Sequence, residues 1–246
     1  MPRNLVSRRK QSGFTLVEIA IVLVIIGLLL GGVLKGQELI NSAKVKNMVN
    51  DFRSTSTFVS GYQDRFRAFP GDQNQGQVDA AFGTTPVNGA QANICTPTAP
   101  GKCAINNGHL DGSWNDKTVA SETYIFWQHV RLANLAAGPV DTTVGNFLPT
   151  NADGGQIGIE SGISATGTAT PFITGMRGSY YVCMEGVLGR YAKQIDTTMD
   201  DGNTAGGSVQ AVAQGSTRGV NADTSIGGTP TATINDGSQY IVCAAF

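Results

Sequence analysis

The run from Phe14 to Leu34 constrains this 246-residue chain more than any other feature, because it carries a single charge, Glu18. As a helix, a run of this length spans the roughly 30 Å hydrocarbon core of a bilayer. A charged side chain inside a bilayer costs about 3 kcal/mol on insertion scales unless it finds a partner. The run therefore predicts a membrane-spanning helix whose acid has a specific role.

The residues before this run are basic. Arg3, Arg8, Arg9 and Lys10 precede Gly13 with no acid among them, which predicts a cytoplasmic N-terminus and export of the rest of the chain. Both an N-terminal anchor and a removable signal fit this pattern, although no A-x-A cleavage pattern follows the run. Without residues 1–13, 17 − 4 = 13 basic residues face 18 acidic ones, a net charge of −5. That charge disfavours nonspecific nucleic-acid binding.

An amphipathic helix is predicted to continue through residues 36–69. Its apolar residues recur every three, four or seven positions, as they do on one helix face. Pro70 and Gly71 are expected to end the helix. The stripe consists of Val45, Met48, Val49, Phe52, Val59, Tyr62, Phe66 and Phe69.

Residues 70–246 are predicted to form one soluble domain. The low charged fraction of 14% and the 32 glycines of the chain favour strands, turns and loops. We expect loops over 72–117, a helix over 119–137, and strands over 179–187, 208–213 and 239–244. The predicted class is α+β: a long N-terminal helix, with a membrane half and an amphipathic half, packed on a hairpin-rich antiparallel sheet with long loops.

The sequence from Gly13 to Glu18, GFTLVE, resembles the processing site of type IV pilins and of the pseudopilins of type II secretion. The resemblance implies that a membrane peptidase cuts after Gly13 and that Phe14 becomes an N-methylated first residue. Residues 1–13 would then be a cytoplasmic leader that is removed, and residues 14–35 the membrane segment that later forms a filament core.

The same resemblance implies a partner for Glu18. In an assembled filament, the new amine of Phe14 on a neighbouring subunit would lie beside the Glu18 carboxylate, and a slipped subunit would leave both charges unpaired. Glycines within and just after the apolar run (Gly27, Gly31, Gly32 and Gly36) allow close helix packing. Many pilins carry a proline where this chain has Lys35, so local unwinding of the helix is not assured.

Four cysteines follow the apolar run, in the part of the chain predicted to lie in an oxidising compartment. They are Cys95, Cys103, Cys183 and Cys243. By analogy with the bridge that closes the C-terminal region of many pilins, Cys183 pairs with Cys243, and Cys95 with Cys103 remains as the local pair. Spacing alone leaves three connectivities open.

A zinc site is the alternative use of these cysteines. The chain has no C-x-x-C motif, and only His109 and His129 are available as further ligands of the usual kind. Disulfides are therefore the favoured interpretation.

A cluster of oxygen-bearing side chains suggests calcium. Asp196, Asp200, Asp201 and Asn203 lie within one short stretch, and hard oxygen ligands on a loop are what Ca²⁺ binds. Some pseudopilins, which the chain resembles, hold calcium in a loop near their C-terminal end. The alternative is a solvated turn with side chain to backbone hydrogen bonds. A weaker candidate consists of Asn106, Asn107 and Asp111.

The sequence offers little for catalysis, because it contains no G-x-S-x-G, H-E-x-x-H or phosphate-loop motif. We predict a structural protein rather than an enzyme: a subunit of a type IV pilus-like helical filament. Its predicted partners are further copies of itself, prepilin peptidase and the inner-membrane assembly machinery. Its predicted location is the inner membrane as a precursor and the cell surface after assembly. A type II secretion pseudopilin and a membrane-tethered binding module are the alternatives.

Overall fold

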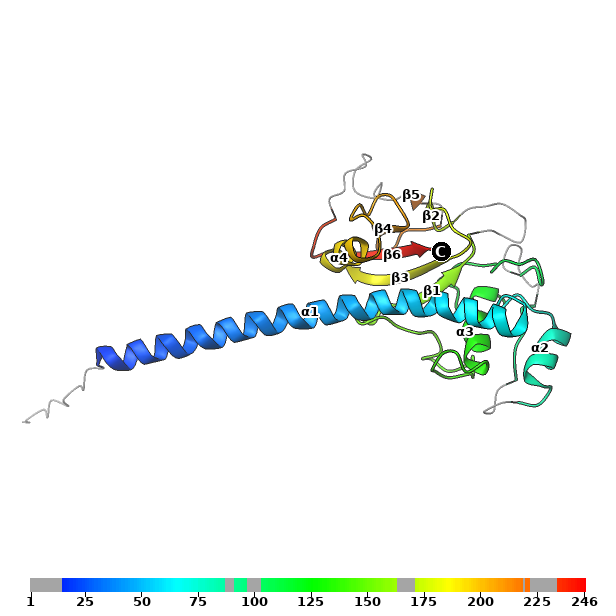
Figure 1. Cartoon of the computed structure of the whole chain (residues 1–246), viewed down its shortest axis with the longest axis horizontal. Helices are drawn as coiled ribbons and strands as arrows, with labels where there is room; N and C mark the ends of the chain where they lie inside the picture. The colour runs from blue at the N-terminus through cyan, green and yellow to red at the C-terminus, as the bar shows by residue number, and fades with distance from the viewer. Residues whose placement is uncertain (1–14, 87–90, 97–102, 163–170, 219, 222–233) are drawn as a thin grey trace, which may run out of the picture. The chain divides into compact units, whose positions relative to one another are not determined.

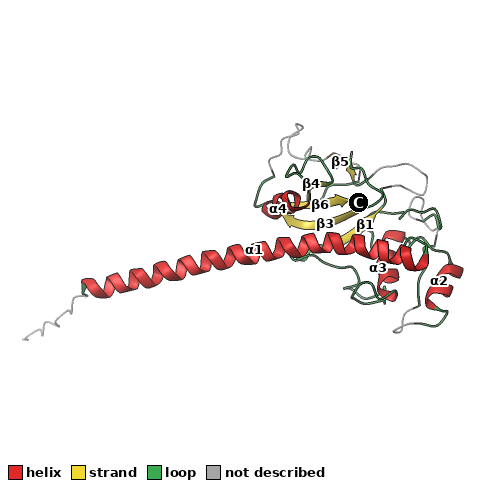
Figure 2. Ribbon diagram, viewed as in Figure 1, coloured by secondary structure: helices red, strands yellow, loops and turns green. Residues whose placement is uncertain are grey.

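A computed structural model describes residues 15–86, 91–96, 103–162, 171–218, 220–221 and 234–246 (Figure 1). The chain divides into two compact units, residues 1–43 and residues 44–246. The class is α+β, with a long N-terminal helix and a four-stranded antiparallel sheet (Figure 2).

The first helix, α1, covers Leu16–Phe66. Within the second unit its apolar stripe is buried as predicted: Val45, Met48, Val49, Phe52, Val59 and Tyr62 are at most 6% exposed, while Phe66 and Phe69 are partly buried. The predicted end at residue 69 is three residues too late. Arg67 adopts a left-handed conformation with φ 54°, and its N–H bonds to the Gln63 carbonyl. This arrangement ends the helix before Pro70 can act.

The main sheet has the order β1-β3-β6-β4, with every neighbouring pair antiparallel. Its strands are β1 (Ile157–Glu160), β3 (Tyr181–Leu188), β4 (Val209–Ala213) and β6 (Gln239–Ala245). The predicted strands correspond to β3, β4 and β6, and β1 was missed. The expectation of many hairpins was wrong, because a further strand lies between the members of each adjacent pair in chain order.

The two faces of this sheet bury different clusters, because side chains alternate along each strand. Val182 and Met184 of β3 belong to the cluster that contains the buried stripe of α1. Tyr181 and Cys183 belong to a second cluster with Trp114. The sheet therefore has buried apolar residues on both sides.

Two further helices lie between α1 and the sheet in chain order. The short helix α2 (Gln75–Phe82) lies in the region expected to be a loop, and it begins with a capping box between Asn74 and Gln77. The helix expected over 119–137 is α3, which covers only Glu122–Leu132, and all of its residues are buried. It ends early because Asn134 adopts a left-handed conformation with φ 58°, before Gly138 and Pro139 are reached.

The remaining elements were not anticipated. Helix α4 (Gly189–Met199) follows β3 directly and buries Tyr191, Ala192 and Ile195. Two short strands, β2 (Ile173–Thr174) and β5 (Val220–Asn221), form a separate parallel pair. The pairing partner of a two-residue strand is set by tertiary contacts, so sequence patterns do not reveal it.

Both disulfides in the structure match the expected pairing. Cys183 and Cys243 are opposite residues of β3 and β6, with their Cα atoms 4.1 Å apart. Cys95 and Cys103 are bonded before the start of α3, and both sulfur-bearing residues are buried with Ile125 of that helix.

Candidate functional site

The segment of α1 from Leu16 to Ile40 carries large apolar side chains on every side. Each of these side chains is between 46% and 91% exposed. Its most apolar 18-residue window has a mean hydropathy of 2.8 and none of it is buried. By length and composition this helix can cross a membrane. A helix that is apolar all round requires either lipid or other helices around it.

Glu18 lies in the first turn of α1. Its carboxylate accepts hydrogen bonds from the N–H and the hydroxyl of Thr15, at 2.9 and 2.8 Å, and the Glu18 N–H donates to the Thr15 hydroxyl at 3.3 Å. This is the reciprocal pattern of a capping box. Gly13 and Phe14, the predicted processing residues, lie outside the described residues, so the Glu18 and Phe14 pairing stays a prediction.

The helix is continuous through Gly27, Gly31, Gly32 and Gly36. A Cβ added at any of the four would meet nothing within 4 Å, so the space beside each glycine is open to a neighbouring molecule. Lys35, which stands where many pilins have proline, forms an exposed ion pair of 2.6 Å with Glu38. In this structure the helix does not unwind at Lys35.

The structure brings together three of the four predicted calcium ligands. A carboxylate oxygen from each of Asp196, Asp200 and Asp201 lies within 4.8 Å of the others. Asp196 belongs to the last turn of α4 rather than to a loop. The fourth residue, Asn203, accepts a hydrogen bond from the Ala205 N–H with its side-chain oxygen, as expected for a polar turn.

The acids of this cluster have different environments. Asp196 is fully buried, and while its Oδ1 accepts the Gly202 N–H, its Oδ2 is buried without a hydrogen-bond partner. Burial raises the pKa of Asp196 to about 6. The Asp200 carboxylate instead accepts the N–H groups of Val209 and Ser208, chiefly Val209, and these bonds lower its pKa.

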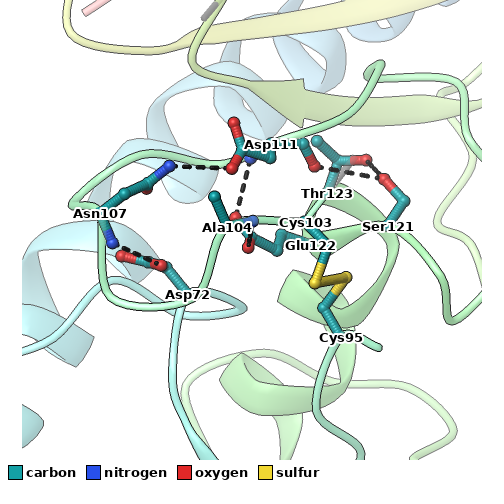
Figure 3. Close-up of a disulfide and its surroundings, with 9 residues drawn as sticks. All are labelled: Asp72, Cys95, Cys103, Ala104, Asn107, Asp111, Ser121, Glu122 and Thr123. Carbon is teal, nitrogen blue, oxygen red and sulfur yellow. Dashed lines mark hydrogen bonds between the residues drawn. A yellow bond between two sulfur atoms is a disulfide. The ribbon is translucent and has the colours of Figure 1, made fainter. Parts of the chain in front are cut away.

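Two residues of the weaker calcium candidate, Asn107 and Asp111, belong to a hydrogen-bond network with Asp72. Asp72 accepts the Asn107 and Gly108 N–H groups with its two carboxylate oxygens, and the Asn107 amide donates to Asp111 at 2.8 Å. Figure 3 shows the bonds of Asn107 to Asp72 and to Asp111. The other carboxylate oxygen of Asp111, Oδ1, is buried without a hydrogen-bond partner.

Sequence reasoning missed Glu122, the first residue of α3. Its carboxylate is fully buried and accepts the N–H groups of Ala104 and Asp111, both at 2.9 Å. Burial raises the pKa of Glu122 to about 8, and the nearby acids Asp111 and Asp72 add to the rise. The only sequence signal was an acid in the first turn of the helix expected over 119–137, where an acid is more often solvated.

The two histidines have different settings. His129 is buried in α3, where its Nδ1 accepts the Gly71 N–H at 3.0 Å and its Nε2 bonds to the Asn93 carbonyl at 2.8 Å. Burial lowers the pKa of His129 to about 4, so the ring is neutral and holds two chain segments together. The backbone of His109 bonds to the Asn107 side chain. Neither histidine is grouped with the cysteines among the described residues.

A family model for the prokaryotic N-terminal methylation motif matches residues 8–34. The chain therefore carries a prepilin-type methylation motif, consistent with the type IV pilin and pseudopilin family. The motif implies processing by prepilin peptidase and suggests a structural role. Together with the long apolar helix, it indicates membrane anchoring of the precursor. No curated protein and no solved structure matches the chain.

Proposed function

We propose that this protein is a structural subunit of a type IV pilus-like surface filament. The observation that supports this most strongly is the exposed apolar helix from Leu16 to Ile40, which begins within the methylation motif. In the precursor, lipid covers this segment. After cleavage following Gly13, the same segments of many copies cover one another, and head-to-tail contacts that do not close generate a fibre.

Glu18 sets the stagger between subunits in this proposal. It is the single charge of the 14–34 run, and in the described chain its carboxylate bonds only to Thr15 of its own helix. A carboxylate among packed apolar helices is stable only when paired. The amine created at Phe14 of the next subunit is the partner that cleavage supplies, and it is available only at one axial offset.

The first experiment is intact-mass analysis and N-terminal sequencing of protein from sheared cell-surface filaments. An abundant chain that starts at methylated Phe14 in the shear fraction supports a filament subunit. Processed protein confined to the membrane fraction would contradict a surface filament. That result would support a type II secretion pseudopilin or a tethered binding module.

The second experiment compares Glu18→Ala with Glu38→Ala. We expect the first variant to be made, anchored and folded, but absent from filaments. Glu38 is the matched control, because it is an exposed acid on the same helix beyond the apolar run, paired with Lys35 at 2.6 Å. Loss of filaments in both variants, or in neither, would contradict the specific role of Glu18.

We also propose that Asp196, Asp200 and Asp201 bind Ca²⁺. The buried and unpartnered Oδ2 of Asp196, beside two further carboxylates, supports this. A buried acceptor without a partner costs about 1–3 kcal/mol, and a cation would satisfy it. The three acids would supply carboxylate oxygens, and backbone carbonyls and water the rest of the six to eight ligands that Ca²⁺ takes.

Calcium binding is tested by thermal unfolding of the full chain in detergent micelles with CaCl2, with MgCl2 and with a chelator. At 100 times the dissociation constant, a ligand of the folded state adds about 2.7 kcal/mol of stability, so Tm should rise by about 5 °C or more. Asp201→Asn should remove most of this rise. Asp236→Asn, at an exposed acid paired with Lys193, should keep it. An equal calcium effect in both variants, or none in the wild type, would refute the site.

A further inference from the structure

The Cys95–Cys103 disulfide lies beside Glu122, a buried acid that has no part in the proposed filament assembly or calcium binding. A carboxylate oxygen of Glu122 and the two sulfur atoms lie within 4.8 Å of one another, and all three residues are buried. Figure 3 shows the Glu122 carboxylate hydrogen bonded to Ala104 and Asp111, with the Cys95–Cys103 disulfide in the same region. Once the disulfide is reduced, the two thiolates and the carboxylate are all of ligand types that bind zinc.

We propose that reduction of the Cys95–Cys103 disulfide creates a zinc site, with the two thiolates and the Glu122 carboxylate as ligands and water in the fourth position. Zinc and the disulfide are then alternative cross-links for the same part of the chain. In the oxidised protein the disulfide joins Cys95 and Cys103 near the start of α3. In the reduced protein zinc would join them and Glu122.

The electrostatic surroundings favour a cation here. Two further acids, Asp111 and Asp72, act on the Glu122 carboxyl group. Both of them are buried. A divalent cation would therefore enter a region of negative potential, and thiolates select Zn²⁺ over the harder Ca²⁺ and Mg²⁺.

The distance between the two sulfur atoms also requires that the disulfide be reduced before zinc binds. A disulfide holds its sulfurs about 2 Å apart, whereas bonds of about 2.3 Å to one tetrahedral zinc place two thiolates nearly 4 Å apart. Breaking the bond lets the sulfurs of Cys95 and Cys103 separate to that distance. Glu122 can stay hydrogen bonded to the Ala104 and Asp111 N–H groups while binding, because each carboxylate oxygen has a second lone pair.

The chemistry balances with a dithiol as the reductant. The dithiol gives two electrons to the Cys95–Cys103 bond, closes into its own disulfide, and passes one proton to each freed sulfur. Zinc binding then releases the two thiol protons, and the Glu122 proton where that carboxyl is protonated.

The chain contains its own control. Cys183 and Cys243 form a second disulfide, and among the described residues they belong to no group of potential metal ligands. They lie inside the sheet among apolar residues. Reduction should therefore create a metal site at the first cysteine pair and none at the second.

The test uses the full chain in detergent micelles, reduced with a dithiol, desalted without oxygen and titrated with Co²⁺ as a spectroscopic probe for zinc. We expect one Co²⁺ per chain, with thiolate-to-cobalt charge-transfer bands that Zn²⁺ removes, in the wild type and in the Cys183→Ser/Cys243→Ser variant. The oxidised protein and the Cys95→Ser/Cys103→Ser variant should show no such bands. Glu122→Gln should weaken binding at least about tenfold.

Circular dichroism of each sample separates loss of binding from loss of folding. A folded, reduced Cys183→Ser/Cys243→Ser variant without the charge-transfer bands would overturn the proposal. Unchanged affinity in folded Glu122→Gln would overturn the role of Glu122. If reduction unfolds the chain, Zn²⁺ should restore the fold in the variant that keeps Cys95 and Cys103, and failure to do so would also overturn the proposal.

Discussion

The two halves of α1 have the same secondary structure and opposite relations to the rest of the molecule. From Leu16 to Ile40 the apolar side chains point in all directions and remain at least 46% exposed. From Val45 to Tyr62 they form one stripe whose members are at most 6% exposed, and Phe58 beside it is partly buried. The first half is apolar enough for a bilayer, and the second is patterned for one face of a domain.

The difference teaches that hydrophobic content and hydrophobic pattern carry different information. The stripe of the second half shows which face of the helix is buried, and residues of the sheet in the same unit pack against it. The first half has no polar face, so its covering must come from outside the chain, as lipid around the precursor and, in the proposed filament, as other copies. Each of the following predictions separates the roles of the two halves.

The largest effect is expected from truncation in the buried stripe. Phe52 is fully buried in the main cluster, so Phe52→Ala should destabilise the domain by about 3–5 kcal/mol. Leu29 is 63% exposed, and Leu29→Ala should leave the same unfolding transition unchanged. Urea unfolding in micelles, followed by the fluorescence of Trp114 and Trp127, measures both. An equal loss of unfolding free energy in the two variants would contradict the prediction, because it would show that both halves stabilise the same domain.

A smaller effect concerns pH and Asp51, an acid in the second half. Burial raises the pKa of Asp51 from 3.8 to about 6, so the folded state holds its proton more tightly than the unfolded state does. This contribution to stability is full below about pH 4 and is lost as the pH rises to about 6. Its size is below about 2 kcal/mol, because the group is partly exposed.

Asp51→Asn should remove this contribution, so the difference in Tm between variant and wild type should grow in favour of the variant from pH 4 to pH 7. Asp64→Asn, at an exposed acid of the same helix, is the matched control. A constant Tm difference for Asp51→Asn across this range would contradict the prediction.

The smallest effect compares one ion pair from each half. Lys44 pairs with Asp153 at 2.7 Å, and the Asp153 side chain is only 10% exposed. Lys44→Met should destabilise the domain by about 0.2–1 kcal/mol, and less at high salt. Lys35 and Glu38 pair within one exposed turn, so Lys35→Met should not change domain unfolding. Differential scanning calorimetry at two salt concentrations distinguishes the two cases.

Much of the helix and the sheet could be predicted from local pattern. The stripe from Val45 to Tyr62 repeats often enough to define a helix face, and β3, β4 and β6 are rich in β-branched and aromatic residues. The strand β1 was missed because its four residues, Ile157–Glu160, include a glycine and an acid that is buried by tertiary contacts. Glu160 is held there by the Trp114 N–H and by Arg218, both distant in sequence.

The candidate sites were predictable to different degrees. The Gly13 to Glu18 motif is contiguous, so sequence alone located it. The acidic cluster was located too, but the burial of Asp196 depends on α4, which was not anticipated. Glu122 was out of reach, because its place beside Cys95 and Cys103 depends on how the 103–111 loop folds over α3. Contacts between segments far apart in the chain leave no periodic signal.

The position of β6 in the sheet affects how this domain folds. It is the latest strand of the sheet in chain order, yet it lies between β3 and β4 rather than at an edge. Before residues 239–245 arrive, β3 and β4 have no shared neighbour, and the cysteine on β3 has no partner opposite it. Completion of the sheet therefore depends on long-range pairing, which is slow. The domain can therefore close only after β6 is available to pair with β3 and β4.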